Sequence, residues 1–356
     1  MDWTDLKVCP YITLLHNGEV ELEIEYSKGI HIKGIDLWLD AEGVVDFSFV
    51  SHAHIDHVAR HKRILATPQT AKLYESRMGK KTEVKVLKYH QPYRLRGATI
   101  ELFPSGHVLG SAQIMIQKGG VSLVYTGDFK LRRGWTAEKA EIKKCDILIM
   151  ESTFGLPRYI FPPKREVEKQ IVDFVEEAFS HNRIPVILAY TLGKAQEAMK
   201  LLGNRGFKLS VHGSICKLAS VYEEFGVKFR NYVPYRPENL KGRVLIAPPW
   251  TKNSRMILNI PRKRTALLTG WAVDGQAKNW YGADKLLPLS DHADFSELLE
   301  YAEKANPTKI YTVHGFSEFV NHLKDQGFDA EELRQRGKGF RLSKELLLNY
   351  DLFRIL

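Results

Sequence analysis

The hexapeptide His52-Ala53-His54-Ile55-Asp56-His57 constrains this chain more than any other feature of its sequence. It holds side chains that can ligate a metal, and it follows the apolar run Val44 to Val50, which predicts a strand. On a loop after a strand, its first two histidines can face one metal ion while Asp56 and His57 turn towards a second. Imidazole and carboxylate ligands without thiolate favour zinc, with manganese as the alternative. We therefore expect two divalent metal ions at this loop.

Further candidate ligands follow other apolar runs. These runs and the polar groups behind them are Val121 to Tyr125 before Gly127-Asp128, Ile147 to Met150 before Glu151, and Lys309 to Val313 before His314-Gly315. Asp128 can bridge two metals with its two oxygens, and His314 can close the second site. His107, after Gly106, would complete a three-histidine first site. Polar groups at strand ends predict one site built from distant segments, and runs without clean alternation favour sheets covered by helices on both faces.

A second set of strand candidates lies between these segments and alternates with helical patterns. They are Ile184 to Ala189, Phe207 to Val211, Arg243 to Ala247 and Thr265 to Leu268. Apolar residues at helical spacing, from Val167 to Phe179, precede the first of them. We predict an inserted α/β domain over residues 160–285, between the two parts of a first domain at 1–159 and 286–356.

Composition and charge limit the class of protein. A net charge of +10 permits a polyanionic partner. The cysteines, Cys9, Cys145 and Cys216, form no CxxC pair and predict neither a thiolate metal site nor a disulfide framework. The sequence shows no apolar stretch long enough for a bilayer and no basic leader, so we expect a cytoplasmic protein without membrane contact.

Taken together, the motifs resemble a known superfamily. The series HxHxDH, GH, GD and HG resembles that of the metallo-β-lactamase superfamily. Three more segments resemble its nucleic-acid-cleaving β-CASP members: Glu151 to Gly155 the acidic motif that opens their insertion, Tyr190 to Glu197 its first strand and helix, and Ser290 to Asp294 the returning motif. The resemblance implies an α/β fold, a metallo-β-lactamase αββα sandwich with an inserted α/β β-CASP domain.

The chain is most similar to the ligase-associated DNA exonuclease group, relatives of the Artemis-type repair nucleases. The similarity includes Leu65 to Thr70, Gly106 to Gln113, Ala247 to Pro249 and Leu289 to Asp294. It implies a DNA-binding exonuclease or end-processing nuclease of DNA repair, which hydrolyses phosphodiester bonds by a two-metal mechanism and has a helicase or ligase as partner.

The alternative is a β-CASP RNA endonuclease or exonuclease, because RNA-cleaving members keep a histidine where Artemis-like enzymes carry valine in place of His314. A small-molecule hydrolase needs no such insertion. A non-catalytic scaffold would have lost ligands, whereas every ligand position here is filled. DNA is favoured over RNA by the resemblance alone.

Roles for individual residues follow from the resemblance. The metal ligands are His52, His54, Asp56, His57, His107, Asp128 and His314, and the catalytic residues are Asp56, His292 and Glu151. We expect His292 to give a proton to the leaving oxygen and Glu151 to accept a hydrogen bond from a ligand imidazole, that of His314. Asp294 and Glu297 predict a capping box that sets a helix terminus near the phosphate.

Basic residues of the inserted domain are the candidates for phosphate contacts. They are Lys194, Lys217, Arg262, Lys263 and Arg264. We expect them to line the cleft and to replace counterions on the phosphates.

Overall fold

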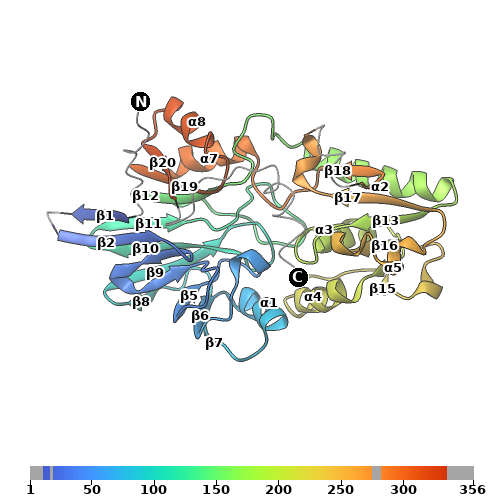
Figure 1. Ribbon diagram of the computed structural model, residues 1–356, viewed down its shortest axis with the longest axis horizontal. Coiled ribbons are helices and arrows are strands. Elements are labelled where there is room, and N and C mark those ends of the chain that lie inside the picture. Colours follow the sequence, from blue (N-terminus) through green and yellow to red (C-terminus); the bar gives the residue numbers. More distant parts are fainter. Residues whose placement is uncertain (1–10, 17–18, 275–281, 335–356) are drawn as a thin grey trace, which may run out of the picture.

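The computed structural model describes residues 11–16, 19–274 and 282–334, which form two lobes (Figure 1). One expectation concerns a residue outside these ranges, namely that Cys9 takes no part in the chemistry. None of the helices in the described ranges is long and apolar enough to cross a membrane.

The first lobe contains two seven-stranded sheets. The first sheet, in spatial order, consists of β1 Tyr11–His16, β2 Glu19–Tyr26, β3 Ile30–Ile32, β4 Leu37–Leu39, β5 Phe47–Phe49, β6 Arg63–Ala66 and β7 Glu83–Val86. The second consists of β20 Ala330–Glu332, β19 Lys309–Gly315, β12 Ile147–Ser152, β11 Val121–Tyr125, β10 Ala112–Lys118, β9 Ala98–Pro104 and β8 Tyr93–Leu95.

The two sheets bury one face of each against the other. Ile24 and Phe49 of the first sheet belong to one buried cluster with Ile114 and Ile149 of the second. Helix α1, Pro68–Met78, covers the outer face of the first sheet, and α7, Phe295–Ala305, with α8, Phe319–Asp325, covers that of the second. The layers are therefore αββα, as the resemblance implied. The expectation that helices cover both faces of each sheet is wrong, because apolar runs can equally pack on another sheet.

The second lobe is built on a six-stranded sheet whose strands are all parallel. In spatial order they are β15 Tyr232–Pro234, β14 Leu209–Val211, β16 Val244–Ala247, β13 Ile184–Leu188, β17 Lys263–Leu268 and β18 Lys285–Leu287. Its helices are α2 Lys164–Ser180, α3 Lys194–Asn204, α4 Gly213–Glu224 and the short α5 Arg255–Leu258. The sheet runs two residues past position 285, where we placed the end of the insertion.

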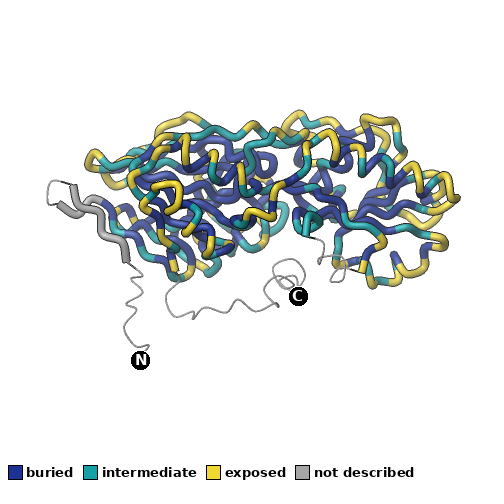
Figure 2. The backbone as a smooth tube through the Cα atoms, turned by 90° about the horizontal axis from the view of Figure 1, so that it is seen from above, coloured by how far each residue is buried: buried dark blue, intermediate teal, exposed yellow. Residues whose placement is uncertain are grey.

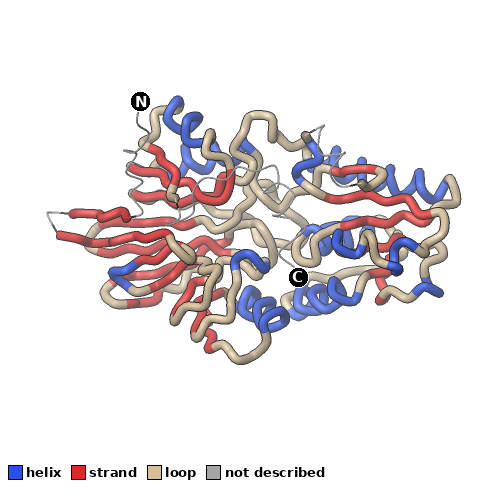
Figure 3. The backbone as a smooth tube through the Cα atoms, viewed as in Figure 1, coloured by secondary structure: helices blue, strands red, loops and turns tan. Residues whose placement is uncertain are grey.

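Each lobe has its own buried core (Figure 2), built from the helices and strands that Figure 3 distinguishes, and the two cores meet at the junction. Helices α2, α3 and α4 cover one face of the parallel sheet, and α5 packs on the other. Ala53, Leu73 and Val108 of the first lobe belong to the same buried cluster as α3 and α4. Side chains of the first lobe thus continue the core of the insertion, which fixes how the two lobes face each other.

Candidate metal centre

The predicted ligands lie where four strands end. The hexapeptide follows β5 and turns through a short 3-10 helix, Ile55–His57, while Asp128 follows β11 and Glu151 is the penultimate residue of β12. Two glycines make these turns: Gly106 at φ +81° and Gly127 at φ +54°. A Cβ on Gly106 would lie 2.2 Å from the carbonyl oxygen of Lys130, and one on Gly127 would lie 2.6 Å from Ser51. Only glycine fits both conditions, because L residues disfavour positive φ.

His314 reaches the site through a bulge. Glu151 pairs with Val313 and Ser152 pairs with Gly315, so His314 is the extra residue of β19 and has φ 51°. A β-bulge re-aims the side chain that it inserts. A Cβ on Gly315 would lie 1.9 Å from the carbonyl oxygen of Ser152, which explains the glycine after this histidine.

Ligand atoms of His52, His54, His107 and Asp128 all lie within 4.8 Å of one another. Nδ1 of His54 is 3.0 Å from Nε2 of His52 and 3.0 Å from Nε2 of His107. Oδ2 of Asp128 is 3.5 Å from Nε2 of His52 and 3.7 Å from Nε2 of His107. Four donors therefore converge on one point, the first site that the sequence predicts.

Asp128 also faces the second group of ligands. Its Oδ2 is 3.4 Å from Nε2 of His57, which in turn is 3.9 Å from Oδ2 of Asp56. The ring of His314 lies 5.5 Å from that of His57, centroid to centroid. The structure thus brings all seven predicted ligands together, with Asp128 between the two groups.

The hydrogen bonds around the rings fit a metal. Nε2 of His54 is 3.1 Å from the carbonyl oxygen of Leu192, and Nδ1 of His107 is 2.8 Å from that of Asp291. Because a carbonyl only accepts, these nitrogens carry the ring protons, and the inner nitrogens present lone pairs to each other. Lone pairs 3.0 Å apart repel unless a cation lies between them. Ligand nitrogens about 2.0–2.1 Å from tetrahedral zinc would be about 3.3 Å apart, close to this spacing.

Burial and the neighbouring charged groups also shift the pKa values of the ligands. Burial lowers the pKa of His54 to about 4, and burial with the nearby His292 lowers the pKa of His107 to about 3. Both rings are thus neutral at pH 7, the form that ligates a metal. Although burial opposes it, His57 and His292 hold the pKa of Asp128 well below its usual range, which keeps the carboxylate ionised.

Two carboxylates hold rings from outside the cluster. Asp40, at φ 45° after β4, accepts from Nδ1 of His57 at 3.0 Å and from the backbone amide of Ser51 at 2.7 Å. Sequence reasoning missed Asp40, whose position after the apolar run Leu37–Leu39 is its only signal. Glu151 accepts from Nδ1 of His292 at 3.0 Å. Its expected partner was His314, but the bulge of β19 turns that ring towards His57 instead.

His292 lies beside the first site. Its ring is 4.7 Å from that of His107, and its Nδ1 is 3.9 Å from Oδ2 of Asp128. Burial opposes protonation, but Glu151 and Asp128 raise the pKa of His292 to about 9. The predicted capping box is confirmed, because Asp294 accepts from the amide of Glu297, whose side chain accepts from the amide of Asp294.

The inserted lobe contributes groups at the cluster. Besides the carbonyl of Leu192, it supplies Lys194, whose Nζ is 2.5 Å from Oδ1 of Asp291. Lys194 is therefore at the site, but it is buried and paired with a carboxylate. Lys217, in α4, donates to the carbonyl oxygen of Ser76 at 2.5 Å, across the lobe junction.

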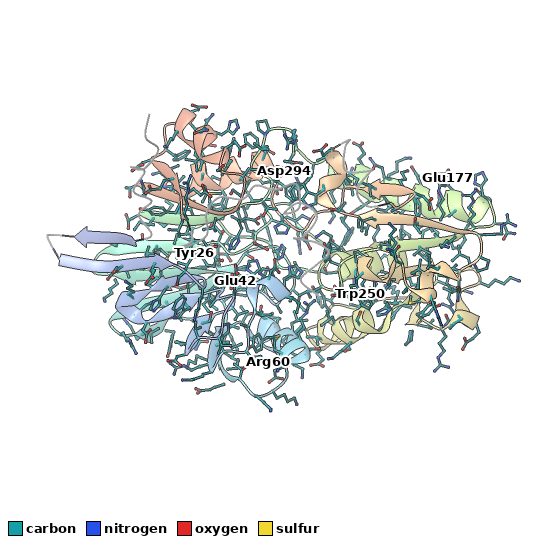
Figure 4. All side chains as sticks on the ribbon, in the orientation of Figure 1. Tyr26, Glu42, Arg60, Glu177, Trp250 and Asp294 are labelled. Atoms are coloured by element: carbon teal, nitrogen blue, oxygen red, sulfur yellow. The ribbon has the colours of Figure 1, made fainter. Side chains whose placement is uncertain are left out.

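The remaining basic residues are elsewhere. Arg262 donates to the carbonyl oxygen of His181, Lys263 to that of Leu258, and Arg264 pairs with Glu177 at 2.7 Å. Figure 4 places Glu177 at the end of the inserted lobe that is far from the first lobe. The expectation that these three line the cleft is wrong, because they precede or begin β17 and the cluster lies at the carboxyl ends of the parallel strands.

An αββα sandwich with a buried histidine and aspartate cluster at its rim, interrupted by a parallel α/β lobe, defines a metallo-β-lactamase fold with a β-CASP insertion. A solved structure described as a protein of unknown function from Enterococcus faecalis V583 has the same fold. It aligns with a TM-score of 0.57 and 14% identity, over 82% of this chain and 80% of that one.

Sequence comparison finds one matching family model and several similar proteins. Residues 284–333 match the family described as "Zn-dependent metallo-hydrolase RNA specificity domain". The chain is 40% identical over 311 residues to a "Probable DNA ligase" of Opitutus terrae, covering 86% of this chain and 31% of the ligase. It is 23% identical to an "RNase J-like protein" of Methanocaldococcus jannaschii, covering 76% of this chain and 82% of that protein. It is 25% identical to "Endoribonuclease YSH1" of Eremothecium gossypii, covering 68% and 39%.

In fold and in sequence the chain is similar to the metallo-β-lactamase/β-CASP family. It spans about a third of the length of the ligase that it matches.

Proposed function

We propose that this protein is a metal-dependent nuclease that hydrolyses phosphodiester bonds with two divalent metal ions, zinc or manganese. The observation that carries the proposal is the convergence of seven ligands beside an inserted lobe that itself bonds to the cluster through Leu192 and His54. A site shared by two lobes suits a long substrate that passes between them.

The residues of the site would have different roles in this reaction. His52, His54, His107 and Asp128 would hold one ion, and Asp56, His57, His314 and the same Asp128 the other. Bound there, the metals would supply Lewis-acid activation of water and of the phosphoryl oxygens. Asp40 orients His57, and Glu151 accepts from Nδ1 of His292. Because Nδ1 of His292 donates to Glu151, its Nε2 faces the substrate and donates a proton to the leaving oxygen.

DNA is the proposed substrate, cleaved from an end during repair in the cytoplasm, with a ligase or a helicase as partner. The 40% identity to part of a protein named as a DNA ligase supports DNA and a ligase, because chains fused in one protein often act together. RNA is the second candidate, favoured by the family match described as an RNA specificity domain and by the similarity to the RNase J-like protein.

Matched strands test the substrate. End-labelled single- and double-stranded DNA and RNA of one sequence are given to the enzyme in excess, with Zn²⁺ or Mn²⁺, and the single-turnover rates are compared. Faster cleavage of DNA, with mononucleotides released from one end, supports the proposal. Clearly faster cleavage of RNA would make RNA the substrate. Products cut within the strand would indicate an endonuclease. The Asp128→Asn variant, prepared in the same way, controls for a contaminating nuclease.

A further inference from the structure

The four central strands of the inserted sheet all lead into an aromatic or imidazole side chain. Tyr190 follows β13, His212 follows β14, Trp250 follows β16 and Trp271 follows β17. In parallel sheets, ligands bind at the carboxyl ends of the strands. This edge is the one that touches the metal cluster, because Leu192, two residues after Tyr190, accepts from His54.

Trp250 is the most open of these side chains. It is 48% exposed, whereas Trp271 packs against Phe154, with ring centroids 4.6 Å apart. The ring of His212 meets Trp250 in a T-shaped contact, with centroids 5.4 Å apart and an interplanar angle of 88°. Such a contact uses one face or one edge of the indole, so a face remains for a further flat partner.

The backbone holds this ring pair in place. Trp250 lies in a 3-10 turn, Pro249–Thr251, that begins with two prolines of fixed φ, and the buried Thr251 hydroxyl donates to the carbonyl oxygen of Pro248 at 2.7 Å. His212 caps α4, where its Nδ1 accepts from the amide of Ser214 at 3.2 Å. An aromatic surface fixed before binding loses little conformational entropy when a ligand stacks on it.

The ring pair lies at the same edge of the parallel sheet as the loop that bonds to His54. Strand β16 lies between β14 and β13, and neighbouring strands are about 4.8 Å apart. The turn that carries Trp250 therefore starts one strand away from the loop that bonds to His54. Figure 4 labels Trp250 in the inserted lobe, beside α4, and α4 packs on α1 of the first lobe.

A cation of the first lobe reaches the loop that follows β13. Arg77, at the end of α1, donates from Nη2 to Thr191 at 3.1 Å, and the charge of Asp56 acts on it. Its buried Nε has no hydrogen-bond partner among the described residues. A guanidinium near Asp56 and the loop after β13 adds positive charge where a substrate strand would pass between the lobes.

We propose that Trp250, backed by His212, stacks on an unpaired nucleobase of the substrate strand, a few nucleotides from the phosphate that reacts. The inference rests on the proposed nuclease function and adds a base subsite to it. The base must be unpaired, because a duplex presents only edges and backbone to a side chain. The subsite accepts any base, since every base has a flat face, and it selects single-stranded over fully paired ends.

Substrates that lack single bases test the subsite. Single-stranded DNA is prepared intact and with one abasic residue at each position in turn from the cleaved end. For the wild type, loss of the stacked base should lower kcat/KM by about 5- to 150-fold at one position, the range for base stacking on aromatic side chains. Trp250→Ala should lower kcat/KM on intact DNA by a similar factor and should show no further loss at that position. Trp250→Phe should recover most of the rate.

Controls separate this inference from the proposed function. Bis(p-nitrophenyl) phosphate has no nucleobase, so Trp250→Ala should hydrolyse it at the wild-type rate. Trp135→Ala removes another indole, 47% exposed but covered by Lys164 with its Nζ 4.2 Å from the ring centroid, and should not change the abasic pattern. If no phosphodiester is cleaved, the proposed function fails, and fluorescence anisotropy with labelled single-stranded DNA still measures the subsite. Wild-type affinity in Trp250→Ala, or losses that multiply with the abasic residue, would overturn the inference.

Discussion

Replacing Lys194 by Met should destabilise the protein strongly, because it leaves a buried carboxylate without its cation. Nζ of Lys194 is 2.5 Å from Oδ1 of Asp291, and the two side chains are 11% and 3% exposed. Apart from this pair, no group in the described part of the chain donates a hydrogen bond to the Asp291 carboxylate. Methionine keeps the aliphatic stem of Lys194 and removes only the charge.

The size of the loss follows from the burial of the pair. Removing one partner of a buried ion pair costs about 3–5 kcal/mol, because the remaining charge stays out of water. The protonated ring of His292 also acts on Asp291 and compensates part of its charge. We therefore expect the lower end, about 3 kcal/mol, for Lys194→Met. The double variant Lys194→Met/Asp291→Asn should recover about 2 kcal/mol of this, since neither partner then carries a charge.

Urea unfolding with a chelator present measures these free energies without a contribution from bound metal. Lys194→Arg, which keeps the cation, is the matched control and should lie within about 1 kcal/mol of the wild type. Lys194→Met that unfolds within about 0.5 kcal/mol of the wild type would refute the reasoning. So would a double variant whose loss equals the sum of the two single losses.

Three further outcomes follow from the site. Asp128→Asn should lose at least one metal and the nuclease activity, because Asp128 faces both ligand groups; wild-type metal content by elemental analysis would contradict this. His292→Ala should keep its metal and lower the single-turnover rate about 10²–10⁴-fold, the usual contribution of general acid catalysis, whereas loss of metal would make His292 a ligand. Changing all of Arg262, Lys263 and Arg264 to Ala should leave the salt dependence of DNA binding unchanged, since these residues form their bonds at the far end of the inserted lobe. A smaller dependence of the binding constant on salt in this variant would show that they contact the phosphates after all.

Much of the site is readable from the sequence because its ligands follow apolar strands. Strand β11 has the bounds that its apolar run predicts, and β19 extends two residues beyond its run. The antiparallel hairpin of β9 and β10 was not predicted from an apolar run. The segment between its strands contains Gly106 and His107, which were interpreted as a ligand motif and not as part of a hairpin connection. Strands β15 and β18 have only three residues each, too few for a pattern.

The residues that hydrogen-bond to the ligands are harder to predict from the sequence than the ligands themselves. Asp40 is a single acid after a short strand, and only the folded chain shows that it bonds to His57. Glu151 was assigned to His314, but a bulge that no residue type announces separates them. The basic residues 262–264 stand out by charge, whereas their position at the amino end of β17 decides where they point. That direction follows from the parallel topology of the sheet, which the structure shows.

The central claim is that the histidine and aspartate cluster binds two divalent metal ions that the hydrolysis of a phosphodiester requires. Protein stripped with a chelator is titrated with Zn²⁺ or Mn²⁺, and bound metal and single-turnover cleavage of end-labelled DNA and RNA are measured on the same samples. Binding should saturate at two ions per chain, and cleavage should rise with their occupancy and be absent from the stripped protein. Cleavage by stripped protein at the rate of the reloaded enzyme, or saturation without any cleavage of either strand, would contradict the claim.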